Sequence, residues 1–369
     1  MSWQEELKKG IRRAEELAPI LGWSEEETAE RAAVAERFPM MITPYYLSLV
    51  DPADPRDPIG RMCIPSPDEF DPGGSFDTSG EASNTKLEGL QHKYAQTVLL
   101  LSTNQCAMYC RHCFRKRMVG LSEDELNRRV DEAVAYVKTH ETVTNILITG
   151  GDAFLNSNEI IRRYLEELTA IKRLDFIRFG SRVPVTLPER IYGDQEFLDM
   201  FAHYAQKKAL YLVTQFNHPR ELTEEAVRAV RAMIERGVQV RNQTVLLRGV
   251  NDSGEVLGQL LSRLTRVGIA PYYIFQCRPV TGVKERFHVP IEEGIRIVDA
   301  AKSRQNGFGK SVRYAMSHPR GKIEILCRLS NGETVFKFHQ SKDDADMARP
   351  FTKLLRPADT WLDNDLNGI

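Results

Sequence analysis

From about residue 95 onward, short β-rich runs alternate with longer amphipathic runs, and this alternation limits the fold more than any other feature. Helical patterns lie between the runs, for example at 123–140 and 223–237, and another begins near Pro290. Successive β–α units predict parallel strands joined by right-handed crossovers. An open doubly wound sheet and a barrel both satisfy the pattern, but six units are fewer than the eight of a complete barrel, so a barrel would be partial and open on one side. The six candidate strands are 97–103, 145–151, 176–182, 209–216, 238–247 and 271–277.

The segments that precede this repeat differ from it in residue pattern and composition. Apolar residues recur at helical spacing in residues 3–18 and 24–37, and Ser24 with Glu27 forms a predicted capping box. Residues 51–80 are so rich in proline, glycine and aspartate that we expect an ordered arm without regular elements.

The repeat stops after about residue 305. Residues 322–339 predict two strands around an Asn331-Gly332 turn, a typical hairpin signal. The last thirty residues are polar and predicted irregular, with a docking element near Trp361. We therefore divide the chain into an N-terminal region (1–90), a barrel (91–305) and a C-terminal segment (306–369).

Charge and hydropathy exclude several classes of protein. The 369 residues include 50 basic and 51 acidic side chains, with a net charge of −1, which disfavours a basic nucleic-acid-binding protein. No apolar run approaches the roughly 18 residues of a membrane span. The charged N-terminus lacks the apolar stretch of a signal peptide. We expect a cytoplasmic protein that binds neither nucleic acid nor a membrane.

Three of the six cysteines lie within eight residues, in the loop that follows the first predicted strand. Cys106, Cys110 and Cys113 have the spacing C-x3-C-x2-C, which in a reducing compartment indicates a metal site rather than disulfides. Thiolates suit iron–sulfur clusters and zinc, and both usually use four protein ligands. Three ligands would leave one metal position open for a small molecule. The alternative is a structural zinc site that borrows His112 or a distant cysteine.

Longer strings extend this pattern and carry a resemblance to a known family. They are TPYYLSL (43–49), GLQHKY (89–94), QCAMYCRHCFRKRMVG (105–120), TGGDAF (149–154), RFGSRVPVTLPERI (178–191), FNHPREL (216–222), NQTVLLRGVND (242–252) and YYIFQC (272–277). From about residue 40 to 340 the chain resembles the lysine 2,3-aminomutase family of the radical S-adenosylmethionine (SAM) superfamily. The resemblance implies an α/β fold, a partial (β/α)6 barrel of the radical SAM type with an N-terminal helical arm and a C-terminal β-hairpin segment.

The resemblance also implies cofactors and partners. A [4Fe–4S] cluster would be held by the three cysteines, and its open iron would bind SAM. A small-molecule substrate, an electron donor such as flavodoxin or ferredoxin, and a homo-oligomer are implied as well. In the family the glycine turn after the second strand supports SAM, and other residues near the cluster orient the ligands. The matching residues here are Gly150, Gly151, Asp152, His112, Arg115 and Gln243, although an ordinary packing or surface role is the alternative for each.

The chain departs from the family where pyridoxal 5′-phosphate is expected. Lys322 occupies the position of the family's coenzyme-binding lysine, but the preceding glycine run has shrunk to Arg320-Gly321. Two arginines that bind phosphate in the family correspond to Lys93 and Thr97, so one anchor is weakened and the other is neutral. The alternative for Lys322 is a solvated lysine at the start of a strand.

A further departure concerns the substrate. Two aspartates that hold the distal ammonium of lysine in the family correspond to Arg278 and, approximately, Ser317. An arginine in that place repels an ammonium and favours an anion, unless it points to solvent or pairs with an internal carboxylate. Free lysine is therefore not the expected substrate.

Three hypotheses follow from these residues. The first is a radical SAM aminomutase that moves an amino group between adjacent carbons of an amino acid bound through pyridoxal phosphate. The second is an enzyme that has lost pyridoxal phosphate and uses the same scaffold for radical chemistry on an anionic substrate. The third is a non-enzymatic protein with a structural iron–sulfur or zinc site. Retention of Lys322 favours the first hypothesis over the second.

Overall fold

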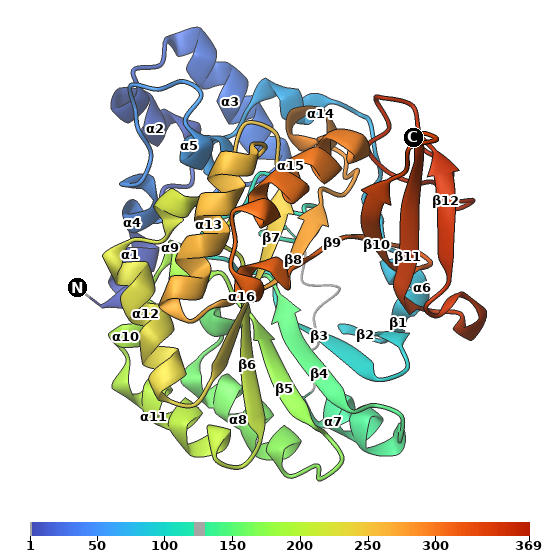
Figure 1. The fold of residues 1–369 in the computed structure, drawn as a ribbon. Helices are drawn as coiled ribbons and strands as arrows, with labels where there is room; N and C mark the ends of the chain where they lie inside the picture. The colour runs from blue at the N-terminus through green and yellow to red at the C-terminus, as the bar shows by residue number, and fades with distance from the viewer. Residues whose placement is uncertain (1, 122–129) are drawn as a thin grey trace.

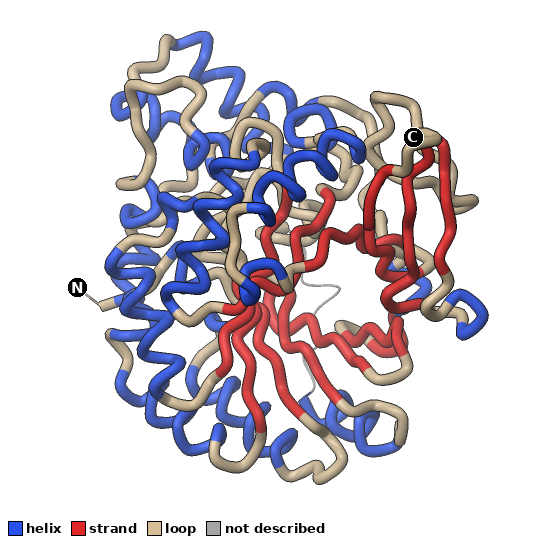
Figure 2. Tube along the Cα trace, viewed as in Figure 1, coloured by secondary structure: helices blue, strands red, loops and turns tan. Residues whose placement is uncertain are grey.

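A curved sheet of parallel strands forms the centre of the protein (Figures 1 and 2). The computed structural model describes residues 2–121 and 130–369, and within them seven consecutive strands pair in parallel. The curved sheet is an incomplete barrel of the radical SAM type, as predicted. The parallel strands are β3 (Thr97–Thr103), β4 (Asn145–Gly150), β5 (Phe176–Gly180), β6 (Ala209–Thr214), β7 (Gln239–Leu246), β8 (Ala270–Gln276) and β9 (Arg313–His318).

Helices cover the outside of the barrel, because alternate side chains of each strand are apolar and point outward. On β5, Ile177 and Phe179 are fully or almost fully buried, and Phe179 packs against Phe154 and Phe201. The residue between them, Arg178, therefore faces the barrel interior. The main outer helices are α7 (Val130–Thr139), α8 (Asn158–Thr169), α11 (Gln195–Ala205), α12 (Glu224–Glu235), α13 (Gly254–Val267) and α15 (Ile291–Ser303).

Antiparallel strands extend both ends of the parallel sheet. All twelve strands pair in the order of the sequence, from β1 to β12. On one side lie β1 (Thr85–Leu87) and β2 (Leu90–Tyr94), and on the other β10 (Gly321–Arg328), β11 (Glu333–Ser341) and β12 (Pro350–Leu354). The Nζ of Lys93 on β2 donates to the backbone oxygen of His318 at 2.5 Å, so a side chain links the two ends of the parallel sheet.

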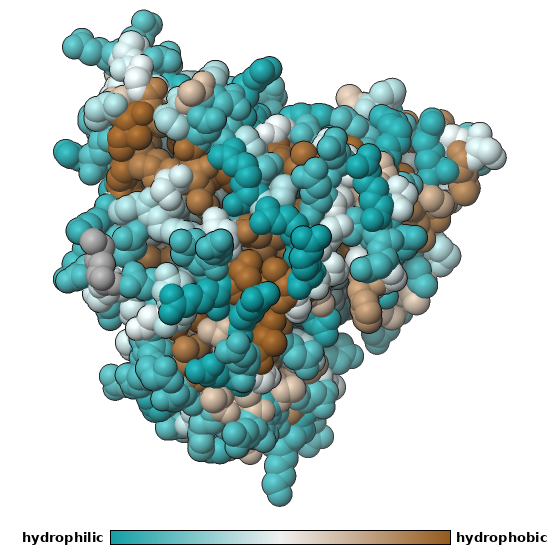
Figure 3. All heavy atoms as spheres, turned by 60° about the vertical axis from the view of Figure 1, so that its left-hand side comes forward, coloured by the Kyte–Doolittle hydropathy of each residue, from teal (hydrophilic) through white to brown (hydrophobic). Residues whose placement is uncertain are grey.

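The N-terminal helices pack beside the barrel near the cysteine loop. They are α1 (Trp3–Lys8), α2 (Ala14–Leu21), α3 (Glu25–Arg37), α4 (Pro44–Leu47) and α5 (Pro58–Cys63). Shorter elements are α6 (Glu81–Asn84), α9 (Val183–Thr186), α10 (Glu189–Tyr192), α14 (Lys284–Phe287) and α16 (Gly307–Lys310). The side of the molecule that carries the N-terminal helices and α10 to α13 is mainly hydrophilic, with separate apolar patches (Figure 3). No helix of the described residues combines the length and apolarity that a membrane span requires.

Several predicted elements are confirmed and others are wrong. The six strands, the helix at α12 and the hairpin of β10 and β11 lie where they were predicted. The predicted single helix at 3–18 is two helices, because the chain bends at Gly10 and forms a bridge from Ile11 to Ile42. Residues 122–129 of the helix predicted at 123–140 lie outside the described residues.

The arm at 51–80 and the C-terminus are more regular than predicted. Pro58 begins α5 at a helical position that suits proline, and the Asp57 side chain accepts a hydrogen bond from the Gly60 amide at 2.7 Å. The last thirty residues include β12, which pairs with β11. Trp361 is buried, in agreement with the predicted docking element. The division into three regions stays a prediction.

Candidate active site

The cysteine loop lies at the carboxyl end of β3, the edge at which α/β barrels place their sites. The N-terminal arm holds this loop by backbone hydrogen bonds. The Tyr109 amide donates to the Met41 oxygen and the Arg111 amide donates to the Met62 oxygen, each at 2.9 Å. Cys106, Cys110 and Cys113 are partly buried, and burial raises the pKa of the Cys113 thiol to about 11.

A buried ionic group fastens the arm to the loop. The carboxylate of Glu69 accepts two hydrogen bonds from Arg111 Nε, at 2.9 and 3.1 Å, and one from Lys116 Nζ at 2.5 Å. Arg286 Nη1 lies 3.6 Å from the same carboxylate. Burial alone would raise the pKa of Glu69, but Arg111 and Lys116 lower it to about 2. The side chain that follows Cys110 is thereby fixed by a carboxylate from the arm.

Arg182 makes a direct contact with a cysteine of the loop. It follows β5, and its Nη1 donates to Cys110 Sγ at 2.9 Å. Its Nη2 donates to Glu221 Oε1 at 2.5 Å, and Nε donates to the Gln215 oxygen at 3.0 Å. Tyr46 also donates to Glu221 Oε1, at 2.7 Å. The guanidinium is therefore held rigidly while one of its N–H groups points at sulfur.

The glycine turn after β4 packs directly against the loop. Gly150 has φ of +120°, in a region that favours glycine, and a Cβ on Gly151 would lie 2.3 Å from the Gln105 oxygen. Glycine is thus required at both positions because the turn approaches the backbone of residues 102–105 closely. This requirement does not depend on contact with a ligand. The carboxylate of Asp152 is buried, and accepts hydrogen bonds from the amides of Phe154 (3.0 Å) and Arg182 (2.7 Å).

His112 is a neutral, buried side chain. Burial, with Arg182 and Lys116 nearby, holds its pKa well below the usual range. Nε2 lies 2.9 Å from the amide nitrogen of Gln215 and 3.3 Å from Asn217 Nδ2, so it accepts and the ring proton lies on Nδ1. Nδ1 is buried without a hydrogen-bond partner among the described residues. His112 can therefore donate one hydrogen bond to a bound group.

Cations gather inside the barrel beyond the loop. Arg278 stacks on Phe114 at 4.0 Å from the ring centroid and donates to Ser79 Oγ at 3.0 Å. Lys322 Nζ lies 4.3 Å from the centroid of the Tyr273 ring. Burial, together with the charges of Arg178 and Lys93, lowers the pKa of Lys322 to about 7. Lys322 is half-buried against the Tyr273 ring, so it is less exposed than the solvated-lysine alternative requires.

Burial and nearby positive charges also affect Lys93 and Arg278. The pKa of Lys93 falls to about 7 because of burial and the charge of Arg278. The pKa of Arg278 falls to about 10, mainly through burial. Among the described residues no carboxylate lies within ion-pair distance of Arg278, although Glu81 acts on it from farther away, and the side chain is half-buried. A region with this charge favours an anionic ligand.

The structure places the remaining predicted residues on strands β3, β7 and β9 and in the cysteine loop. Ser317 on β9 lies directly opposite Lys322 in the antiparallel register, and Gln243 on β7 is opposite Tyr273. Arg115 Nη1 donates to the Gly150 oxygen at 3.4 Å, which joins the loop to the glycine turn. Thr97 lies at the first position of β3 beside Asn145, with 3.3 Å between Oγ1 and Oδ1. The roles of all these residues in binding stay predictions.

Comparison with known proteins identifies the family. The profile of the radical SAM superfamily matches residues 100–260. An L-lysine 2,3-aminomutase of Clostridium subterminale is 38% identical over 83% of this chain and 73% of its own. One from Acetoanaerobium sticklandii is 37% identical over the same shares. The chain belongs to the lysine 2,3-aminomutase family of radical SAM enzymes. A further member, a glutamate 2,3-aminomutase of Clostridioides difficile (strain 630), is 33% identical over 86% of this chain and 74% of its own.

Membership of the lysine 2,3-aminomutase family makes the chain an enzyme of the radical SAM aminomutase type, an isomerase, and rules against the non-enzymatic hypothesis. The family implies a [4Fe–4S] cluster and SAM. Soft thiol donors at the end of β3 and an N–H donor aimed at one sulfur fit an iron–sulfur cluster. Across residues 2–121 and 130–369, no three His, Cys, Asp or Glu side chains converge on a single metal ion. In a cluster each cysteine binds a different iron, so such convergence is not required.

Sequence analysis of this aminomutase-family member did not find Arg182, Glu221, Glu69 or Arg178. Arg182 is the last residue of the predicted strand 176–182, at the edge where catalytic side chains cluster, and this position was an available signal. Glu69 offered no signal, because its partner Arg111 lies 42 residues away.

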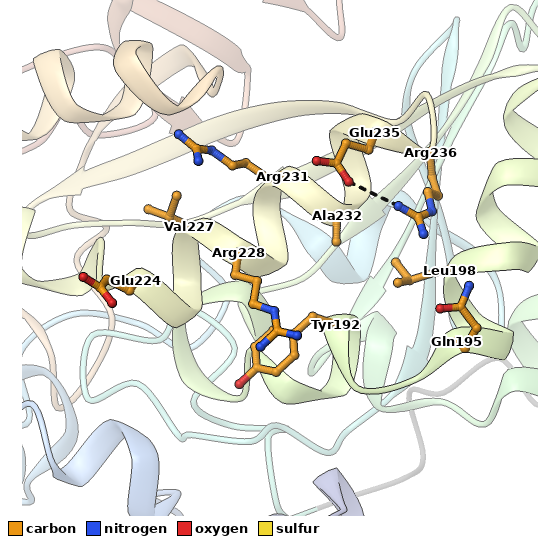
Figure 4. A pocket seen from close by; sticks show the side chains of 10 residues that line it. All are labelled: Tyr192, Gln195, Leu198, Glu224, Val227, Arg228, Arg231, Ala232, Glu235 and Arg236. Atoms are coloured by element: carbon orange, nitrogen blue, oxygen red, sulfur yellow. Dashed lines mark hydrogen bonds and ion pairs between the residues drawn. The ribbon is translucent and has the colours of Figure 1, made fainter.

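The barrel interior is distinct from a hollow on the outer surface (Figure 4). That hollow has a volume of about 480 Å³ and lies over α10, α11 and α12. The Arg228 guanidinium lies across the Tyr192 ring there, 4.3 Å from its centroid, and Glu235 pairs with Arg236. None of the predicted site residues lines it.

Proposed function

We propose that this enzyme catalyses a 1,2-amino migration on an amino acid bound through pyridoxal phosphate at Lys322, and that this amino acid carries a second acidic group. The observation that carries the proposal is the environment of Lys322. Its pKa of about 7 leaves much of the amine neutral, and therefore nucleophilic, at neutral pH. When bound, the cluster and SAM would supply a hydrogen-abstracting radical, and pyridoxal phosphate would stabilise a radical on the migrating nitrogen.

Each part of this chain would have a separate task. Cys106, Cys110 and Cys113 would hold the cluster. The turn at Gly150 to Asp152 would place SAM against it. Lys93 would offer a positive charge to the coenzyme phosphate, although without the paired contacts of an arginine. The N-terminal arm, through Glu69, would close the cluster side of the barrel against water.

Arg278 supports an acidic substrate. Its guanidinium is half-buried against Phe114, donates to Ser79 and lies near Lys93, with Glu81 acting in the opposite sense, and it would repel a lysine ammonium placed beside it. A carboxylate would form a charge-assisted pair with it. A family member named for glutamate, from Clostridioides difficile, makes dicarboxylic amino acids the first substrates to test.

The test begins with coenzyme binding. Anaerobically reconstituted protein is incubated with pyridoxal phosphate, reduced with borohydride and freed of unbound coenzyme, with Lys322→Ala in parallel. We expect covalently retained coenzyme in the wild type and none in the variant. If neither protein retains coenzyme while both cleave SAM reductively, the enzyme is the pyridoxal-independent alternative that acts on an anionic substrate.

Substrate choice is tested on the loaded enzyme with glutamate, aspartate and lysine. We expect turnover of an acidic amino acid, and an increase in KM of about 10-fold or more in Arg278→Gln with a smaller change in kcat. Arg163→Gln, in an exposed ion pair on α8, is the control. Turnover of lysine by the wild type, unaffected by Arg278→Gln, would reject the acidic substrate.

A further inference from the structure

Arg178 brings a positive charge into the barrel, and no carboxylate of the described residues forms an ion pair with it. It lies in the middle of β5 and faces inward, between two outward-facing buried residues. Nη2 donates to Asn145 Oδ1 at 2.6 Å, whereas Nε is buried and has no hydrogen-bond partner in the part of the chain that the structure describes. Among residues 2–121 and 130–369, no carboxylate forms an ion pair with Arg178. A guanidinium enclosed in this way is an incomplete binding group.

The groups around Arg178 increase the need for negative charge. Arg178 is the first of the charges that lower the pKa of Lys322, so the guanidinium lies close enough to act on that amine. Lys93 and Arg313 act on Lys322 in the same direction. The other neighbours of Arg178 are neutral rings, with Phe176 at 5.8 Å and Tyr211 opposite it in the parallel register. Tyr272 and Tyr273 also act on Arg178 and favour its charged form, but neither is a carboxylate.

The position of Arg178 is fixed by the strand next to it. Its partner Asn145 also contacts the Gln96 oxygen and Thr97 Oγ1, at 2.9 and 3.1 Å from Nδ2. This chain of contacts holds the guanidinium near the first residues of β3 and β4. Thr97 is neutral where the family has a phosphate-binding arginine. Arg178 supplies a positive charge nearby, on β5, the strand next to that of Asn145. A rigid, planar donor with a free N–H is suited to an oxyanion.

We propose that Arg178 binds the phosphate group of the pyridoxal phosphate held at Lys322, as the arginine anchor of that group. This inference rests on the proposed function for the identity of the anion. A buried guanidinium without an ion pair is tolerated because the bound phosphate supplies the negative charge.

The experiment compares two ligands that differ only in the phosphate. Dissociation constants for pyridoxal phosphate and pyridoxal are measured with the full chain, for wild type, Arg178→Gln, Arg178→Lys and the surface control Arg163→Gln. We expect Arg178→Gln to raise the dissociation constant of pyridoxal phosphate by about 10- to 100-fold and that of pyridoxal by less than about twofold. The dissociation constant of Arg178→Lys for pyridoxal phosphate should lie between those of wild type and Arg178→Gln. The control should have the dissociation constants of the wild type.

A second readout uses inorganic phosphate and thermal unfolding without coenzyme. We expect phosphate to raise the melting temperature of the wild type and not that of Arg178→Gln. If Arg178→Gln weakens the binding of both ligands equally, or weakens the binding of neither, the assignment is overturned. If the wild type binds neither ligand but phosphate stabilises it through Arg178, the anion site stands and the proposed function fails. If phosphate has no effect either, both fail.

Discussion

Arg182 Nη1 donates a 2.9 Å hydrogen bond to Cys110 Sγ, and the same guanidinium is paired with the buried carboxylate of Glu221. A strand-end residue on β5 is thereby joined to a cysteine of the β3 loop. Donors to cluster sulfurs stabilise the reduced, more negative state, and so raise the reduction potential.

We predict that Arg182→Gln lowers the reduction potential of the reconstituted cluster, whereas Arg182→Lys lowers it less. A tenfold change in the one-electron equilibrium corresponds to about 59 mV. Redox titration monitored by electron paramagnetic resonance measures the shift. An unchanged potential in Arg182→Gln, with a full complement of iron, would show that the contact has no electronic effect.

Glu69 is expected to be essential for stability, because three cations surround it in the interior. Removing one partner of a buried ionic group costs about 3–5 kcal/mol, and we expect Glu69→Gln to lower the free energy of unfolding by an amount in that range. Glu16→Gln, in an exposed pair with Arg13, should change it by less than about 0.5 kcal/mol. Urea unfolding at pH 7 makes the comparison.

The contribution of Glu69 should also depend on pH. Its pKa in the folded protein, about 2, is below the usual value of 4.5, so the stabilisation is complete above about pH 4.5 and is lost as the pH falls toward 2. The difference between wild type and Glu69→Gln should therefore shrink in acid. A difference that stays constant from pH 7 to pH 3 would contradict this pKa.

Lys322 should change stability in the same direction with pH, but in a more alkaline range. Its pKa of about 7 in the folded protein is below the ordinary 10.5, so the folded state binds fewer protons than the unfolded state between these values. Without coenzyme, wild type should gain stability relative to Lys322→Met as the pH rises from 7 toward 10.5. Urea unfolding at several pH values tests this, with Lys337→Met on the exposed side of β11 as the control.

The close packing of the glycine turn predicts a sensitive position. A Cβ at Gly151 would lie 2.3 Å from the backbone oxygen of Gln105, which has no side-chain freedom to move away. We expect Gly151→Ala to cost about 1–3 kcal/mol and to reduce iron incorporation, because the cysteine loop must shift. Gly307→Ala, where a Cβ has open space, is the control. Normal iron content in Gly151→Ala would show that the loop adapts.

Local patterns in the sequence were enough for the main elements of the barrel. Period-2 and period-3.6 runs gave the strands from β3 to β8 and the helix α12, and Asn331-Gly332 gave the turn between β10 and β11. These features depend on neighbouring residues, whose propensities and turn chemistry act over a few positions. The strand β1 has only three residues, too few for a period-2 pattern, and β9 is completed by pairing with β8, which is distant in the sequence.

The cysteine spacing likewise determined the candidate cluster site, because three thiols within eight residues are brought together by one loop. What surrounds that loop was decided only by the tertiary structure. Arg182 reaches Cys110 across 72 residues, Glu69 reaches Arg111 across 42, and Arg178 contacts Asn145 across 33. In the sequence these charged residues cannot be distinguished from charged residues on the surface. Only burial, which removes water and leaves each charge to its protein neighbours, makes one a partner of sulfur, one an anchor of the arm and one an unbalanced cation inside the barrel.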